Sequence, residues 1–186
     1  MKSTMMSAPL LVNSLLERAG ALFPDVAIVS MQPDGSPHSY SYRDLRRRSR
    51  QLAAALEGAG VAKGDRVATL MWNGHEHLEA YFGVPLTGAV LHTLNLRLHP
   101  DELAYIVNHA DDSYVLFDIT FAALVDALAP QCPKVRGWIA LTDDARQAME
   151  KSHADSQSGE RAPKHSYSLA DYGLTAEEVK ERFAGL

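Results

Sequence analysis

Between residues 66 and 141, four short apolar runs alternate with segments of helical periodicity. The apolar runs are Arg66–Met71, Val90–Thr93, Tyr114–Phe117 and Trp138–Leu141. Short strands that are apolar along most of their length are typical of a parallel sheet covered by helices on both faces. Crossovers between such strands are right-handed almost without exception. The pattern therefore predicts an α/β fold with a Rossmann-like, mainly parallel sheet of about four strands and flanking helices.

The intervening segments supply those helices. The sequence predicts them at His75–Thr87, Asp101–His109 and Phe121–Leu128. Pro100 suits the first turn of the second helix, along which apolar residues recur on one face. Each predicted helix thus has a strand on either side of it in the sequence.

A small hairpin is predicted ahead of the sheet. The segment Val12–Phe23 has apolar residues at helical spacing, and Ala27–Ser30 is typical of a strand. The turn residues at 33–37 then return the chain through a second strand at His38–Tyr42. The N-terminal part is therefore expected to hold a helix followed by an antiparallel hairpin.

A second N-terminal helix follows the hairpin. Ser41 and Asp44 form a capping-box pattern at its start, and Gly58 and Gly60 are suited to its end. Five arginines lie on several faces of this helix, and we expect them to form a solvated surface rather than a phosphate or CoA site. They are Arg43, Arg46, Arg47, Arg48 and Arg50.

The composition narrows the classes of function. The net charge is −5, which argues against recruitment to nucleic acid or to an anionic membrane. No stretch has the length of a membrane span or the pattern of a signal peptide. Cys132 is the only cysteine, so no intramolecular disulfide forms, and we expect a structural thiol. A cytoplasmic location is the expectation that fits these features.

Six motifs from Val61 to Asp118 identify a family by their order and spacing. They are Lys63–Ala68, Asn73, Glu79–Gly83, Gly88–Val90, Asn95–Leu98 and Glu102–Ile106. This series resembles the start of the acyl-activating, adenylate-forming ligases, and most closely the fatty-acyl-CoA synthetases. The resemblance extends over about Leu10–Thr142.

The resemblance implies a fold and a reaction. Residues 1–142 would be part of the N-terminal AMP-binding domain, residues 143–174 a polar linker and residues 175–186 a short C-terminal helix. A complete enzyme of the family joins a fatty acid or other carboxylate to AMP with ATP and Mg²⁺, and then transfers the acyl group to CoA. Further sheet and a barrel-like subdomain would cover apolar surface that this piece exposes, so a homodimer or association with a full-length ligase is expected.

The family's phosphate-binding loop has no good counterpart here. That loop reads Ser-Gly-Thr-Thr-Gly-x-Pro-Lys-Gly, whereas the segment Ser158–Lys164 keeps Ser-Gly and Pro-Lys but is one residue shorter between them. Glu160 also brings a carboxylate to a place where triphosphate charge would lie. We therefore expect a truncated ligase that is inactive by itself, with no catalytic, cofactor-binding or metal-binding residues in this chain.

Two other classes of function stay open. The chain could be a non-catalytic interaction module that pairs with a full-length ligase, with the helix at Thr175–Leu186 shielding an exposed sheet edge. It could also be an unrelated small nucleotide-binding enzyme, which only the fold class favours.

Several polar residues in the family block have structural interpretations. Asp65 is expected to shape the turn before the first strand. The segment Trp72–His75 lies at the carboxyl end of that strand, where ligands of such sheets bind, so Asn73 could contact a ligand, but we expect it to cap the helix that follows. His75 and His77 do not share a helical face as zinc ligands at i and i+4 do, so a metal site is not expected. Arg97 near a strand end and Glu102 in the first turn of the next helix could form an ion pair.

Overall fold

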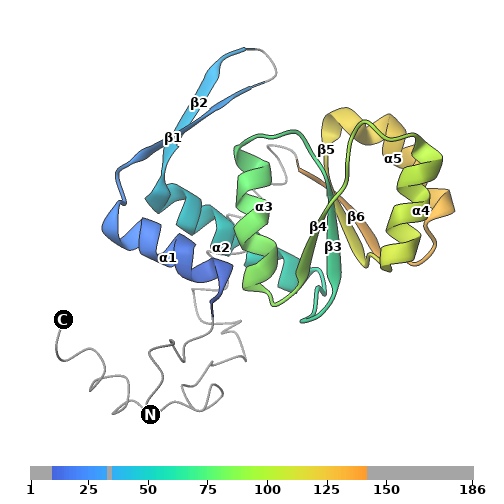
Figure 1. Cartoon of the computed structure of the whole chain (residues 1–186), viewed down its shortest axis with the longest axis horizontal. Coiled ribbons are helices and arrows are strands. Elements are labelled where there is room, and N and C mark those ends of the chain that lie inside the picture. The colour runs from blue at the N-terminus through green and yellow to red at the C-terminus, as the bar shows by residue number, and fades with distance from the viewer. Residues whose placement is uncertain (1–9, 33–34, 142–186) are drawn as a thin grey trace, which may run out of the picture. The chain divides into compact units, whose positions relative to one another are not determined.

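The computed structural model describes residues 10–32 and 35–141 (Figure 1). The polar linker predicted at 143–174, the helix predicted at 175–186 and the loop segment Ser158–Lys164 lie outside these residues. Those three predictions are therefore not addressed by the described structure.

The N-terminal part consists of two helices with a hairpin between them. Helix α1 covers Val12–Leu22, strand β1 Ala27–Met31, strand β2 Pro37–Ser41 and helix α2 Tyr42–Gly58. The two strands pair antiparallel, and the hairpin extends away from the helices in Figure 1. The predicted order of elements is confirmed, with boundaries shifted by only one or two residues.

Local hydrogen bonds set both ends of α2. At its start the Ser41 hydroxyl accepts from the N–H of Asp44 at 3.2 Å, and the Asp44 carboxylate accepts from the N–H of Ser41 at 3.2 Å. At its end the N–H of Val61 donates to the carbonyl of Leu56 at 2.9 Å. These bonds satisfy backbone groups that a helix leaves unpaired at its termini, so the predicted capping box and helix end are confirmed.

The second part is a parallel sheet. Its strands are β3 (Arg66–Leu70), β4 (Val90–Thr93), β5 (Tyr114–Asp118) and β6 (Gly137–Leu141). The strand order is β4-β3-β5-β6, and every pairing is parallel. The predicted four-stranded parallel sheet is confirmed, and β3 and β5 occupy its centre.

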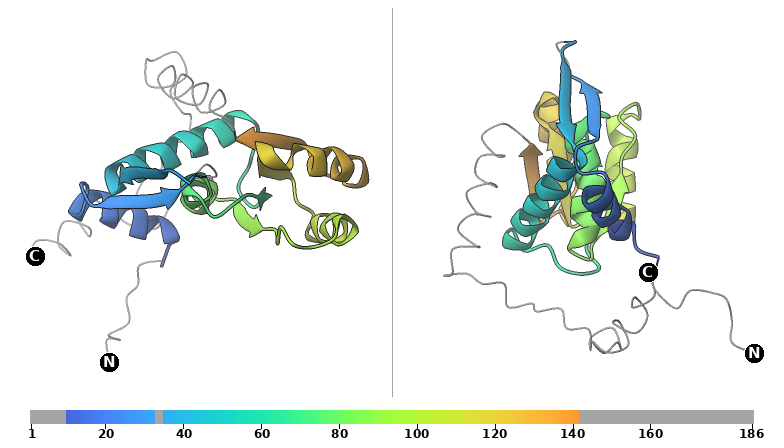
Figure 2. Two further views of the ribbon diagram at one scale, coloured as in Figure 1. Left: turned by 90° about the horizontal axis from the view of Figure 1, so that it is seen from above. Right: turned by 90° about the vertical axis from the view of Figure 1, so that its left-hand side faces the viewer.

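Helices cover both faces of this sheet. Helix α3 (His75–Leu86) lies on one face with α2, and α4 (Pro100–Ala110) and α5 (Ala122–Leu128) lie on the other (Figures 1 and 2). Short 3₁₀ turns precede and follow α5, at Ile119–Phe121 and Ala129–Gln131.

Alternate residues of the central strands β3 and β5 belong to two different apolar cores, one on each face of the sheet. Ala68 of β3 and Val115 of β5 pack with α4 and α5, whereas Val67 and Leu116 pack with α2 and α3. All four side chains are fully buried. Because successive strand residues face opposite sides of a sheet, a continuously apolar strand supplies both cores at once.

The prediction that the arginines of α2 form a solvated surface is wrong in part. Arg46 and Arg50 contact Glu17 of α1 at 2.6 and 2.7 Å, and Arg48 contacts Glu79 of α3 at 2.5 Å. The side chain of Arg48 is only 17% exposed, so a solvated surface is the wrong description for it. The physical reason is that α2 packs between α1 and α3, and carboxylates from both helices meet its arginines.

Among the helices in residues 10–32 and 35–141, we find none with the length and apolar character needed to cross a bilayer.

Candidate functional site

Two hollows lie at the carboxyl end of the parallel sheet. The first, which we call the hairpin hollow, has a volume of about 270 Å³ and is lined by Met31 and Gln32 of the hairpin, by residues 71–76 and by Asp118. The second, which we call the strand-end hollow, has a volume of about 470 Å³ and is lined mainly by residues 71–73 and 93–97. Ligands of open α/β sheets bind beyond the carboxyl ends of the strands, so this is the candidate site.

Trp72 lies between the two hollows and lines both. Its indole N–H donates to the Thr120 hydroxyl at 3.0 Å, and its ring centroid lies 4.9 Å from that of Phe121. The side chain is nonetheless 52% exposed. These contacts hold a large apolar ring in place at the end of β3 while leaving one side of it accessible.

Asn73 does not cap α3, and that prediction is wrong. The N-cap is Gly74, which has an extended backbone and makes no side-chain capping bond. The N–H of Gly74 donates to the carbonyl of Trp72 at 2.8 Å. This tight turn puts Asn73 at its tip, exposed and facing both hollows.

The two histidines and Glu79 at the start of α3 have different partners. His75 lies 2.9 Å from Glu76 through Nε2, and its Nδ1 lies 3.5 Å from the Ser30 hydroxyl of β1. His77 instead faces the sheet, and Glu79 faces α2. The two imidazoles therefore point to different sides of the helix, as the sequence predicted.

His77 is 7% exposed and lies against the central strand of the sheet. Its Nε2 is 3.0 Å from the Thr69 hydroxyl. Burial lowers the pKa of His77, and the nearby Trp72 backbone opposes that effect in part. The imidazole is therefore neutral at neutral pH, and it forms part of the wall of the strand-end hollow.

Arg97 and Glu102 do not pair in the structure, which corrects a third prediction. The carboxylate of Glu102 accepts from the N–H of His99 at 3.0 Å as part of a capping box for α4. The backbone N–H of Arg97 donates to the Asn95 side chain at 3.1 Å, so the loop is held locally. The α4 cap uses the carboxylate that was expected to meet Arg97, and Arg97 lines the strand-end hollow instead.

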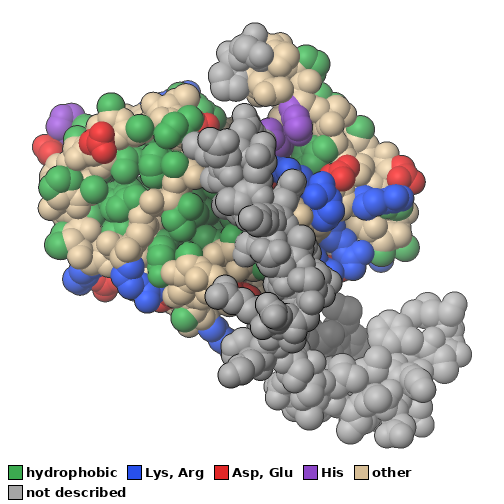
Figure 3. All heavy atoms as spheres, turned by 180° about the vertical axis from the view of Figure 1, so that it is seen from behind, with side chains coloured by type: hydrophobic (Ala, Val, Ile, Leu, Met, Phe, Trp, Pro, Cys, Tyr) green, Lys and Arg blue, Asp and Glu red, His purple; other side chains and the backbone are tan. Residues whose placement is uncertain are grey.

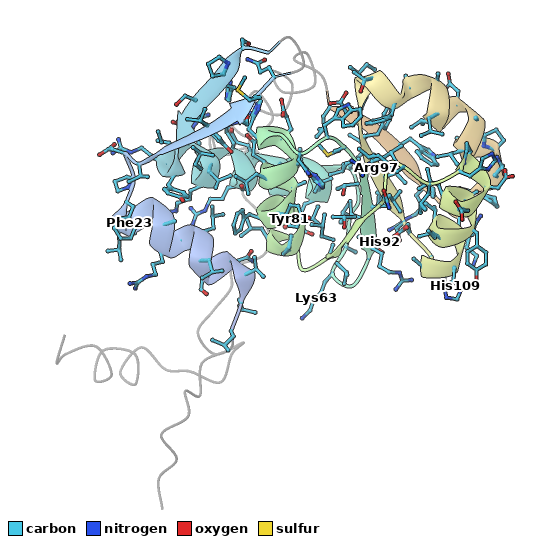
Figure 4. All side chains as sticks on the ribbon, turned by 45° about the horizontal axis from the view of Figure 1, so that its top comes forward. Phe23, Lys63, Tyr81, His92, Arg97 and His109 are labelled. Atoms are coloured by element: carbon cyan, nitrogen blue, oxygen red, sulfur yellow. The ribbon has the colours of Figure 1, made fainter. Side chains whose placement is uncertain are left out.

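Figure 4 shows how two labelled residues of that hollow are positioned. Tyr81 projects from α3 and is 45% exposed, and Arg97 belongs to the loop between β4 and α4. Sequence reasoning did not single out Tyr81 for this site. Trp72 was recognisable only from its place directly after the first strand of the sheet, where ligands of such sheets bind.

Asp65 lies at the opposite end of the sheet from both hollows. Its carboxylate accepts from the N–H of Ala62 at 2.9 Å and from the Ser113 hydroxyl at 3.3 Å, and it also pairs with Arg136. Burial raises the pKa of Asp65, but these bonds outweigh burial and the net pKa lies below its ordinary value. Gly64 beside it has φ +88°, as the predicted turn requires. Asp65 thus ties a turn to the ends of two strands.

A partly buried histidine–carboxylate pair joins β4 to the residue that follows the C-cap of α4. Nδ1 of His92 is 2.8 Å from the Asp112 carboxylate, which is fully buried. Burial raises the pKa of Asp112, and His92 opposes that shift. Burial, with a smaller contribution from Asp112, also raises the pKa of Cys132. Cys132 therefore stays a thiol packed in the core, in agreement with its predicted structural role.

Within the described residues, no group of three or more histidine, cysteine, aspartate or glutamate side chains is arranged to hold a metal ion.

Comparison with known proteins identifies the family. The sequence model of the AMP-binding enzymes matches residues 16–180. The chain belongs to the AMP-binding enzyme family. The resemblance read from the motifs is thereby confirmed.

The similar members of this family include several acyl-CoA ligases. The chain is 46% identical over 143 residues to a long-chain-fatty-acid–CoA ligase of Thermus thermophilus, covering 77% of this chain and 26% of that protein. It is 41% identical over 141 residues to a 3-methylmercaptopropionyl-CoA ligase of Ruegeria pomeroyi, covering 76% and 26%. The chain thus spans about a quarter of the length of these relatives.

Solved structures agree with the fold. A putative long-chain-fatty-acid CoA ligase from Rhodopseudomonas palustris is 32% identical with a TM-score of 0.62, over 72% of this chain and 33% of that one. The N-terminal domain of FACL13 from Mycobacterium tuberculosis has a TM-score of 0.68 at 24% identity, over 76% and 35%. The α/β layer and hairpin are therefore the N-terminal part of an adenylate-forming ligase fold.

Proposed function

We propose that these residues belong to an ATP-dependent acyl-CoA ligase. In the complete reaction a carboxylate attacks the α-phosphate of ATP, pyrophosphate leaves, and the acyl group of the acyl-adenylate passes to the thiol of CoA. The observation that carries the proposal is the 46% identity, over 143 residues, to a long-chain-fatty-acid–CoA ligase. Relatives of similar identity are named for different carboxylates, so the acyl group is left open.

Within that enzyme this stretch acts as scaffold rather than as the adenylation centre. The hairpin hollow is lined by Glu76 and Asp118, whose carboxylates would repel a triphosphate. Neither hollow has the glycine- and hydroxyl-rich loop that wraps phosphates with backbone N–H groups. The described residues thus do not fit ATP with its magnesium ion, and we assign neither group to them.

The strand-end hollow is the part that we expect to face a ligand in the complete enzyme. Arg97 supplies a cation there, Asn73 an amide, and Trp72 an aromatic face. In the complete protein, replacement of Arg97 by Ala should raise the KM for CoA, whereas Arg43→Ala on the exposed face of α2 should leave it unchanged. An unchanged KM for CoA in the Arg97 variant would remove this assignment.

The 186-residue chain by itself should not adenylate a carboxylate. The test is ATP–pyrophosphate exchange with the purified chain and a set of short, medium and long fatty acids, with the Thermus thermophilus relative as the positive control. We expect exchange with the control and none with the chain. Exchange that depends on both ATP and a fatty acid would overturn the scaffold proposal.

A non-catalytic interaction module is the second candidate. Strand β6 is an edge strand, bonded on one side to β5 within the described residues. Figure 3 shows hydrophobic side chains gathered on the face of the sheet layer that is turned away in Figure 1. A surface of this kind favours a homodimer or association with a full-length ligase. Sedimentation of the chain alone and mixed with such a ligase tests this, and a monomer in both experiments would exclude it.

A cytoplasmic location is also a proposal, supported by a single, buried and unpaired cysteine.

A further inference from the structure

Trp72 is held by the turn that follows the neighbouring strand. Strands β3 and β5 run parallel with Leu70 opposite Phe117, so Trp72 and Thr120 both lie just beyond the carboxyl end of the sheet. The indole N–H of Trp72 donates to the Thr120 hydroxyl at 3.0 Å. Phe121 of the same turn packs against the indole, with ring centroids 4.9 Å apart and planes inclined by 37°. The position of the ring is therefore set by contacts from a second strand end.

The hydrogen bond of Trp72 is the first of a chain that ends on a carboxylate. The hydroxyl of Thr120 donates to Oδ1 of Asp118 at 2.7 Å, and the N–H of Thr120 donates to the same oxygen at 2.9 Å. Asp118 is the last residue of β5 and the N-cap of the turn Ile119–Phe121. A hydroxyl that donates to a carboxylate becomes a better acceptor, and an indole N–H can only donate. We call Trp72, Thr120 and Asp118 the indole anchor.

The indole anchor fixes a ring that is not part of the core. The side chain of Trp72 is 52% exposed, and its hydrogen bond to Thr120 lies at the surface. An exposed indole N–H could bond to water instead, and holding a surface side chain in one rotamer costs conformational entropy. The anchor thus spends a hydrogen bond on the orientation of an accessible aromatic ring, which is what a binding surface requires and a core residue does not.

The anchored ring separates two hollows of different charge. Asp118 lines the hairpin hollow, whereas Arg97 lines the strand-end hollow, and Trp72 lines both. Among the described residues of the strand-end hollow, Arg97 is the one that carries a full charge at neutral pH. An anionic group at Arg97 therefore has an uncharged aromatic wall between itself and the carboxylate of Asp118. Loss of that wall would bring the anion closer to a like charge.

We propose that Thr120, with Asp118 behind it, is a positioning residue that holds Trp72 as the inner wall of the strand-end hollow. This inference rests on the proposed function, in which that hollow faces CoA. CoA carries phosphates at one end and an uncharged arm of amide and methylene groups. The phosphates would meet Arg97, and the arm would pack on the accessible side of the indole. Thr120 acts only through Trp72 and does not touch the ligand.

The orientation of the ring can be measured in the chain itself. Its two tryptophans are Trp72 and Trp138, so isotopic labelling of tryptophan nitrogen gives two indole N–H signals in nuclear magnetic resonance spectra. Trp138→Phe assigns them. Thr120→Val keeps the shape of the side chain and removes the hydroxyl, whereas Thr120→Ser keeps the hydroxyl and is the matched control.

We expect the indole N–H of Trp72 to exchange faster with water in Thr120→Val, and the ring to become more mobile. In Thr120→Ser both properties should stay as in the unchanged chain. The signal of Trp138 reports on the fold, because this residue packs against the core covered by α4 and α5. It should be the same in all three proteins.

Titration of the same samples with CoA tests the role of the ring in binding. CoA should shift the signal of Trp72 and leave that of Trp138 in place. The half-saturating concentration should rise by about two- to tenfold in Thr120→Val, the range set by one lost hydrogen bond, and should not change in Thr120→Ser. Arg97→Ala should abolish the shift, whereas Arg43→Ala should keep it.

Four results would overturn the proposal. The first is equal exchange of the Trp72 indole N–H in Thr120→Val and the unchanged chain, and the second is equal half-saturation by CoA in these two proteins. The third is a Thr120→Ser variant that behaves like Thr120→Val, because the hydroxyl would then not be the group that matters. Each of these three leaves the assignment of Arg97 standing. The fourth, no response of Trp72 to CoA, would remove that assignment together with the inference.

Discussion

Arg48 and Glu79 meet in a two-pronged ion pair across the interface between α2 and α3. Nε of Arg48 lies 2.5 Å from Oε1 of Glu79, and Nη2 lies 3.2 Å from Oε2. The two side chains are 17% and 8% exposed. The family motif at Glu79–Gly83 therefore has a structural reason to begin with a carboxylate, because Glu79 compensates a cation that α2 brings into the interface.

Removal of one partner of this pair should be strongly destabilising. Replacement of Glu79 by Ala leaves the Arg48 charge largely buried, with an expected loss of about 3–5 kcal/mol in the free energy of unfolding. Urea denaturation measures this loss. Arg43→Ala is the control, since Arg43 pairs with Asp25 on the surface and should cost less than about 1 kcal/mol. Equal losses in the two variants would contradict the account.

The same interface should not tolerate a methyl group at Gly83. A Cβ there would lie 2.9 Å from Cδ2 of Leu52 and 3.1 Å from the Ser49 carbonyl. Gly83→Ala should thus destabilise the protein by about 1–3 kcal/mol through overpacking. In Gly58→Ala, by contrast, the new Cβ meets nothing within 4 Å, so this helical site should gain up to about 1 kcal/mol. Thermal or urea unfolding compares the two, and a neutral Gly83→Ala would show that α2 and α3 are further apart.

His77 should make stability depend on pH. Its pKa is lowered in the folded state, so the unfolded chain binds the proton more readily. The contribution of His77 is therefore complete above its ordinary pKa of about 6.5 and is lost as the pH falls from there toward the folded value. The slope is at most about 1.4 kcal/mol per pH unit.

The variant His77→Gln isolates that slope. Urea denaturation should show a smaller stability difference between about pH 8 and about pH 5.5 for the Gln variant than for the unchanged chain. An unchanged difference would mean that His77 does not titrate with unfolding.

Cys132 should resist thiol reagents while the protein is folded. The side chain is 1% exposed, and its raised pKa lowers the fraction of thiolate. Reaction with an aromatic disulfide should thus be slow in buffer and should go to completion in denaturant. Rapid stoichiometric reaction of the native chain would place the thiol at the surface.

Local features of the sequence predicted most of the fold. The capping box of Ser41 and Asp44 involves residues three apart, and the turn at Asp65 involves its own neighbours, so both could be read from the chain. The central strands β3 and β5 were recognisable because strands buried on both faces are apolar at most positions. Family motifs then added the identity of the fold, which periodicity alone does not give.

Long-range contacts account for what the sequence did not predict. Nothing near Arg48 in the sequence points to its partner Glu79, and nothing near His38 points to the ring of His75, on which it stacks. Each contact forms only when α3 packs against α2 and the hairpin. Asn73 does not cap α3, because the tight turn at Gly74 makes Gly74 the N-cap, one residue later than predicted. Glu102 does not pair with Arg97, because its carboxylate accepts from the N–H of His99 in the cap of α4.

The most direct test of the central proposal is to sequence the encoding DNA beyond codon 186 and to translate every frame. If these residues are the first quarter of an acyl-CoA ligase, a continuation should encode a Ser/Thr/Gly-rich loop ending in Pro-Lys-Gly and, further on, a C-terminal domain with an adenylation lysine. A stop codon followed by no such sequence in any frame would contradict the ligase proposal and leave the interaction module as the function to pursue.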